Sequence, residues 1–157
     1  MRLLAALALG LVLSACSGGG DEKADEPKAP AASSTPTQAA DEAGLKEAAT
    51  EISARFASQD FGGTWAMFDK ASRDAVPRDG YVEMGEVCEY GGAPLEVTSV
   101  RLEGGDAGIA RVGIAGFEQS LKFVYEDGAW AQEATKTTKE FFAPGGGAED
   151  GITEADC

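Results

Sequence analysis

A long stretch without large hydrophobic side chains limits how much of this chain can fold. From Ser17 to Ala40 it carries glycines, charged residues, prolines and small residues. Apart from proline, this stretch has no hydrophobic residue larger than alanine. Such a segment buries too little apolar surface to offset the entropy of ordering, so residues 16–40 are predicted to form a disordered tether. The folded domain is then confined to residues 41–143, followed by a glycine-rich acidic tail at 144–157.

Residues 1–15 are typical of a signal peptide. A positive start, Met1-Arg2, precedes an apolar run from Leu3 to Leu13. As a helix this run would span roughly 17 Å, whereas the hydrocarbon core of a bilayer is roughly 30 Å thick. The run is therefore too short for a permanent transmembrane helix and fits the apolar core of a secretory signal.

The segment that follows, Leu13-Ser14-Ala15-Cys16, resembles the lipobox of bacterial lipoprotein precursors. The resemblance implies cleavage before Cys16 and acylation of its thiol. Two or more acyl chains would hold the domain stably on the extracytoplasmic face of the cell membrane, or on the outer membrane of a two-membrane bacterium. An ordinary secretory signal with a chance cysteine is the alternative. The alanine- and glycine-rich, asparagine-free composition favours an actinobacterial source.

The first part of the domain is predicted to be helical. Apolar residues recur at helical spacing in one stripe: Leu45, Ala48, Ala49, Ile52 and Phe56. Asp60 is placed to cap a second, short helix, and Pro77 with Asp79 marks the start of a third. Gly91-Gly92 is expected to end that third helix.

After Pro94 the apolar residues alternate with a period of two. Strands are predicted at 95–102, with a bulge near Ser99, and at 109–114. A further strand over 121–125 and a return strand opened by Trp130 flank the turn sequence Glu126-Asp127-Gly128. Helices followed by an antiparallel meander predict an α+β domain of about 100 residues.

This layout resembles the nuclear transport factor 2-like superfamily, whose cystatin-like α+β cone wraps a curved antiparallel sheet around N-terminal helices. The likeness rests on the opening helix ending in Phe56, followed by Trp65-Ala66-Met67-Phe68. It also rests on the helix start at 78–82 and the hairpin at 123–130. The resemblance implies a fold and, by itself, no activity.

Cones of this superfamily enclose a pocket near the wide mouth. The resemblance implies an aromatic set of pocket candidates here: Trp65, Tyr81, Phe123, Tyr125 and Trp130. The ketosteroid isomerases of the superfamily place an Asp base and Tyr donors in this cavity, and Asp60, Asp69 and Tyr81 offer those groups. Nothing in their spacing requires that arrangement, and regularly spaced aromatic residues also suit a plain core.

The cysteines suggest a covalent link. With Cys16 acylated, Cys88 and Cys157 remain as a pair outside the cytoplasm, where oxidation favours a disulfide. The alternative is a buried Cys88 and a free Cys157. A catalytic cysteine is not expected, because the chain has no histidine to activate it.

Composition excludes several functions. The formal net charge of −14 opposes nucleic-acid binding, since affinity for phosphates comes from clustered Lys and Arg. Without histidine, Ser-His-Asp catalysis and His-ligated metals are ruled out. The acidic clusters lack the spacing of a calcium loop, so we expect neither a metal nor a cofactor.

Three hypotheses follow. The first is a non-catalytic, lipid-anchored domain that binds a protein partner or a small ligand at the cell envelope. The second is an enzyme of the same fold that uses Asp and Tyr in its cavity. The third is a passive structural lipoprotein. A deep cavity containing a carboxylate would favour the second, whereas a cone filled by side chains, with a large exposed apolar patch, would favour the first or the third.

Overall fold

The computed structural model describes residues 38–114 and 116–157. The predicted signal peptide, the lipobox-like segment with Cys16 and most of the predicted tether lie outside these residues. Five α-helices and four strands are described, together with two short 3-10 helices. In chain order these are α1 (Glu42–Ala57), α2 (Phe61–Ala66), α3 (Lys70–Ala75), α4 (Arg78–Val87), β1 (Glu96–Gly104), β2 (Ala107–Ile114), β3 (Phe117–Glu126), β4 (Ala129–Gln132), α5 (Lys136–Phe141), η1 (Gly147–Asp150) and η2 (Glu154–Asp156).

The predicted order of helices followed by an antiparallel meander is confirmed. The strands pair in the order β1-β2-β3-β4, each antiparallel to its neighbour. Thr98 is left out of the pairing between β1 and β2, which places a bulge beside Ser99, where the sequence predicts one. At the β3–β4 hairpin, Asp127 and Gly128 both have positive φ, as a type I′ turn requires.

Aspartates start three of the helices. Asp41 accepts a hydrogen bond from the backbone N–H of Gly44 at the start of α1, and Asp60 accepts one from Gly63 in α2. Asp69 does the same for α3, a helix that the sequence analysis did not predict. Each carboxylate satisfies a backbone donor that the first helical turn leaves free.

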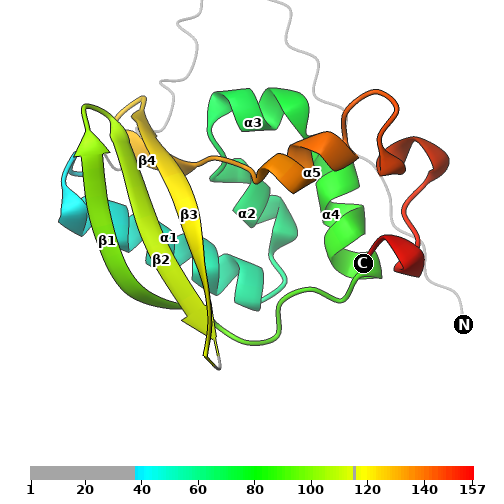
Figure 1. Cartoon of the computed structure of the whole chain (residues 1–157), viewed down its shortest axis with the longest axis horizontal. Coiled ribbons are helices and arrows are strands. Elements are labelled where there is room, and N and C mark those ends of the chain that lie inside the picture. Colours follow the sequence, from blue (N-terminus) through cyan, green and yellow to red (C-terminus); the bar gives the residue numbers. More distant parts are fainter. Residues whose placement is uncertain (1–37, 115) are drawn as a thin grey trace, which may run out of the picture. The chain divides into compact units, whose positions relative to one another are not determined.

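The core lies between α1 and one face of the sheet. The apolar stripe of α1 is buried, and Leu45, Ala48 and Ala49 have no exposed surface. From the sheet, Phe123 and Val112 face the same core. In Figure 1, α1 runs behind the strands, while α2, α3, α4 and α5 lie beside the sheet.

Both ends of the described unit are tied to it. The carbonyl of Gln38 accepts a hydrogen bond from the Tyr125 hydroxyl, and the Gln38 side chain accepts one from the backbone N–H of Trp130. At the other end, a disulfide joins Cys88, at the end of α4, to Cys157. This is the pairing that the sequence predicts, and Cys157 is not free.

Candidate functional site

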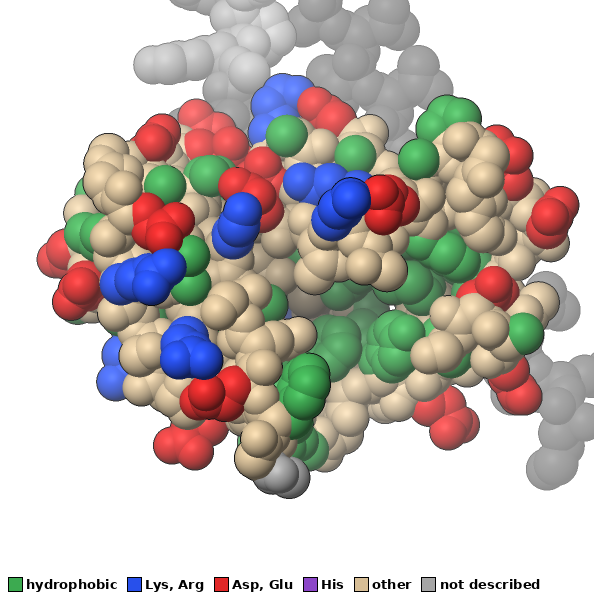
Figure 2. Space-filling view, in the orientation of Figure 1, with side chains coloured by type: hydrophobic (Ala, Val, Ile, Leu, Met, Phe, Trp, Pro, Cys, Tyr) green, Lys and Arg blue, Asp and Glu red, His purple; other side chains and the backbone are tan. Residues whose placement is uncertain are grey.

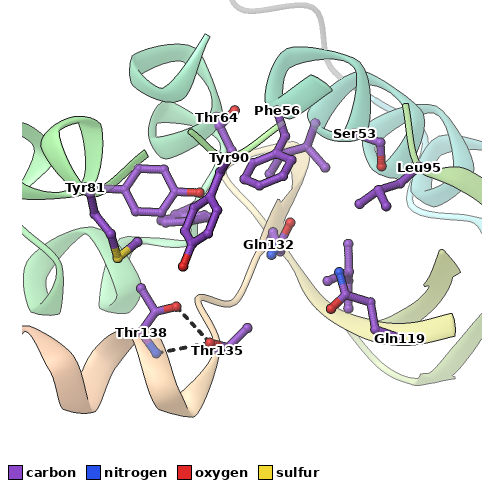
Figure 3. Close-up of a pocket in the computed structure, with 14 residues that line it drawn as sticks. Ser53, Phe56, Thr64, Tyr81, Tyr90, Leu95, Gln119, Gln132, Thr135 and Thr138 are labelled. Carbon is purple, nitrogen blue, oxygen red and sulfur yellow. Dashed lines mark hydrogen bonds between the residues drawn. The ribbon is translucent and has the colours of Figure 1, made fainter. Parts of the chain in front are cut away.

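A hollow of about 200 Å³ lies between the inner face of the sheet and the helices. We call it the Ser53 pocket. Its walls come from α1, α2, α4, α5, β3, the end of β4 and the segments that join these elements. The lining residues are Ile52, Ser53, Phe56, Thr64, Phe68, Tyr81, Met84, Tyr90, Leu95, Gln119, Leu121, Gln132, Thr135 and Thr138. Figure 2 shows hydrophobic side chains lining a hollow beside the sheet, and Figure 3 shows the pocket from inside.

None of the side chains that line the Ser53 pocket is charged. This contrasts with the rest of the chain, which contains 27 Asp and Glu and 13 Lys and Arg. Two kinds of group share the lining: apolar side chains such as Leu95 and Met84, and neutral amides and hydroxyls such as Gln132 and Tyr90. An uncharged, partly polar lining suits an apolar ligand group that also takes hydrogen bonds.

Ser53 is the most unusual member of this lining. Its residue is 3% exposed, and its Oγ is buried without a hydrogen-bond partner among the described residues. In Figure 3 the hydroxyl lies on the pocket side of α1, near Leu95. A buried hydroxyl without a partner costs free energy, so it suggests a site where another molecule completes the hydrogen bond.

Tyr81 brings a second hydroxyl to the pocket from α4. Its ring is buried and packs edge-on against Phe68, with ring centroids 5.1 Å apart. Burial, together with a smaller effect of the nearby Tyr90, raises the pKa of Tyr81 to about 12. Tyr81 is therefore neutral at physiological pH and offers a hydroxyl that donates and accepts hydrogen bonds.

The opposite wall comes from α5 and β3. Thr135 caps α5 by accepting from the backbone N–H of Thr138, and the two threonine hydroxyls are 2.8 Å apart. Gln119 lies on the exposed part of β3, at the edge of the hollow. Gln132 is nearly buried at the end of β4, where its backbone bonds to Met67 and Asp69.

Of the five pocket residues implied by the resemblance, only Tyr81 lines this pocket. Phe123 and Trp130 are 1% and 3% exposed and belong to the core. Trp65 donates its indole N–H to the carbonyl of Val76. Tyr125 packs against Trp130 and holds Gln38, so the hairpin aromatics fix the start of the domain rather than line the hollow.

The candidate carboxylates also lie elsewhere. Asp60 accepts from Gly63 and pairs with Arg55, with 2.9 Å between Oδ2 and the guanidinium nitrogen. Asp69 accepts from the backbone N–H of Ser72 at 3.1 Å. Neither aspartate lines the pocket beside Tyr81, so the described residues do not form the Asp–Tyr pair of an acid-base site there.

Sequence reasoning missed most of the lining, including Ser53, Gln119 and Gln132. One signal was present, because Ser53 lies four residues after Ala49 and three before Phe56, on the apolar stripe of α1. A hydroxyl on a buried stripe indicates either a hydrogen-bonded core serine or a site. The glutamines carried no such signal.

The described residues contain neither a candidate metal-binding cluster nor a helix suited to span a membrane. No three His, Cys, Asp or Glu side chains in this part of the chain come together as a metal-binding group. Within the same residues, no helix has the length and apolar character needed to cross a bilayer.

Comparison of the chain with models of known families, with curated proteins and with solved structures finds no match.

Proposed function

We propose that this protein is a lipid-anchored lipoprotein of the cell envelope whose domain binds a small ligand in the Ser53 pocket without transforming it. We also propose that the helices and sheet form a cone of the nuclear transport factor 2-like kind. The observation that carries the binding proposal is an uncharged pocket with a buried hydroxyl that has no partner. The pocket gives the domain a role beyond passive support of an envelope complex.

The size of the pocket limits the ligand. A volume of about 200 Å³ corresponds to roughly seven water molecules at ~30 Å³ each, below the ~300–1,000 Å³ common for drug-sized sites. The bound group is therefore a single ring system or a short chain. Ser53 and Tyr81 offer hydrogen bonds to it, while Phe68, Leu95 and Met84 offer apolar contact.

The alternative of an enzyme using Asp and Tyr has less support. General acid-base catalysis works best with a group whose pKa is near the operating pH. The Tyr81 hydroxyl, with its pKa raised to about 12, holds its proton too tightly for that role. The aspartates that were candidates for the base are engaged as helix caps. A bound molecule next to Tyr81 is therefore held rather than deprotonated.

Binding of a protein partner also has less support than binding of a small molecule. Among the described residues, the exposed large hydrophobic side chains are Leu102, Ile114 and Phe117. Protein interfaces usually bury a larger continuous apolar patch, with aromatic anchors at its centre. Leu102 lies near the β1–β2 turn, whereas Ile114 and Phe117 pair at the opposite end of the strands, so they do not form such a patch.

The anchor rests on the lipobox-like sequence ending in Cys16. Intact mass spectrometry of the native, membrane-extracted protein tests it. A chain that starts at Cys16 and carries added acyl mass supports the anchor. An unmodified chain that starts elsewhere contradicts it.

Ligand binding is tested by calorimetric titration of the mature chain, residues 16–157, with 1-naphthaleneacetamide. This neutral probe has an apolar ring and a hydrogen-bonding head. Gln119→Trp should weaken binding at least tenfold, because Gln119 borders the hollow and a tryptophan there would fill it. The matched control is Glu118→Trp, on the opposite face of the same strand. No binding, or equal binding by both variants, would contradict the proposal.

A further inference from the structure

We infer that the ligand of the Ser53 pocket carries an anionic head, which lies in a second hollow beside the pocket. This inference rests on the proposed binding function and specifies its ligand. The second hollow, which we call the lysine hollow, has a volume of about 610 Å³. Its lining residues are Ser120, Leu121, Lys122, Glu133, Ala134, Thr135, Lys136, Lys139, Glu140 and Ala143.

The two hollows adjoin each other. Leu121 and Thr135 line both of them, one from β3 and the other from the start of α5. Strand alternation explains the division on β3, because Leu121 points to the core face while Lys122 points to the other. A molecule that passes Leu121 and Thr135 therefore moves from an uncharged lining to a lysine-bearing one.

The charges of the lysine hollow differ from those of the whole chain. Three lysines and two glutamates line it, although acidic residues outnumber basic ones 27 to 13 in the sequence. Lys136 is 3.5 Å from Glu140 and is partly neutralised by it. Lys122 and Lys139 form no ion pair within the described part of the chain, so both ammonium groups remain available to an anion. Glu133 is the remaining acid of the hollow, and it does not pair with any described lysine or arginine.

Most other basic side chains of the domain already have a partner. Arg55, Lys70, Arg73, Arg78, Arg101 and Arg111 each pair with a carboxylate. Two available lysines beside an uncharged pocket thus stand apart from the general surface. They suit a small organic acid whose apolar ring or short chain enters the Ser53 pocket and whose carboxylate or phosphate meets Lys122 and Lys139.

Matched probes test this inference. The probes are 1-naphthaleneacetate, 1-naphthyl phosphate and the neutral 1-naphthaleneacetamide, and the acetate and the amide have nearly the same shape. The wild-type mature chain should bind an anionic probe at least about fivefold more tightly than the amide, equivalent to ~1 kcal/mol from exposed ion pairs. This preference should shrink as salt is raised from 20 to 500 mM, because the lysines are at the surface.

The variant Lys122→Gln/Lys139→Gln should abolish the preference and leave binding of the amide unchanged. The control, Lys70→Gln, removes an exposed lysine that lines neither hollow and should bind like the wild type. The affinities of the two anionic probes are then compared. Tighter binding of the acetate indicates a carboxylate ligand, and tighter binding of the phosphate indicates a phosphate monoester.

Each outcome decides between the two proposals. If acetate, phosphate and amide bind equally well, or if the double variant keeps the preference, the anionic head is refuted while binding in the pocket stands. If none of the probes binds, the proposed function fails and this inference fails with it. If the anions bind but Gln119→Trp has no effect on them, the lysines act as a surface site unconnected to the pocket.

Discussion

Two buried serines, one in α3 and one in α1, differ in whether their hydroxyl groups have a hydrogen-bond partner. Ser72 is fully buried, and its Oγ accepts a hydrogen bond from the backbone N–H of Ala134 at 2.8 Å. Ser53 is almost as deeply buried, but its Oγ has no partner in the described part of the chain. The first hydroxyl is a structural link between α3 and the segment before α5. The second is free to serve a ligand.

Substitution of each serine by alanine should change stability in opposite directions. Ser72→Ala leaves the Ala134 N–H buried without an acceptor and should cost about 1–3 kcal/mol. Ser53→Ala removes an unpartnered hydroxyl and improves helix propensity, so we expect a gain of about 1 kcal/mol. Urea denaturation measures both.

For Ser53→Ala we also expect affinity for 1-naphthaleneacetamide to fall about fivefold, since one hydrogen bond is lost. Greater stability with weaker binding is the signature of a site residue. Lower stability with unchanged affinity would show that Ser53 is an ordinary core residue.

Tyr81 makes stability sensitive to alkaline pH. Its pKa in the folded chain is about 12, above the ordinary value of 10.0, so the folded state keeps the phenol proton more tightly than the unfolded state does. The resulting stabilisation is fully present below pH 10.0 and is lost as the pH rises toward 12, by about 3 kcal/mol at most.

Urea midpoints between pH 9 and 11.5 should therefore fall less steeply in Tyr81→Phe than in the wild type. Absorbance at 295 nm provides a second readout, in which the phenolate signal of Tyr81 should appear only toward pH 12 and should be missing from Tyr81→Phe. Identical pH profiles for the two proteins would contradict the assignment.

At the scale of elements, the sequence identified those with strong periodicity or strong turn signals. The apolar stripe predicted α1, and Asp-Gly predicted the β3–β4 hairpin. The helices α3 and α5 were missed because each has six residues and too short an apolar pattern to reveal a period. Their caps, Asp69 and Thr135, were visible, but a capping residue alone does not distinguish a short helix from a turn.

The pocket could not be predicted from the same signals. Its lining comes from elements whose approach is set by tertiary packing, such as the bridge between Phe68 and Gln132 that brings the helical part to β4. Aromatic residues were reasonable candidates, yet Phe123 and Trp130 fill the core that α1 covers. Polar residues such as Gln119 line a pocket only because α5 lies beside the sheet, where Thr138 lines the same hollow.

At the scale of the whole molecule, the disulfide ties the tail to the helical part. Cys157 follows Cys88 by 69 residues, so the bond closes a loop that contains the entire sheet. In the chain-entropy view, a loop of this length contributes about 4 kcal/mol to stability. The loop also includes α5, which together with its N-cap Thr135 supplies two residues of the pocket wall.

Replacement of both cysteines by serine should therefore lower Tm by roughly 10–20 °C, on the usual scaling for a domain of this size. Scanning calorimetry of the mature chain measures the change, and reduction of the wild type should produce a similar one. An unchanged Tm would show that the tail contributes little to the folded state.

The central claim, that the Ser53 pocket holds the ligand, is tested most directly by methyl NMR of the chain labelled at methionine. Met84 lines the pocket, whereas Met67 lies outside it. With 1-naphthaleneacetamide bound, the account predicts nuclear Overhauser contacts from the naphthalene protons to the Met84 methyl group and none to Met67. Contacts to Met67 alone, or a saturated complex with no contact to Met84, would contradict it.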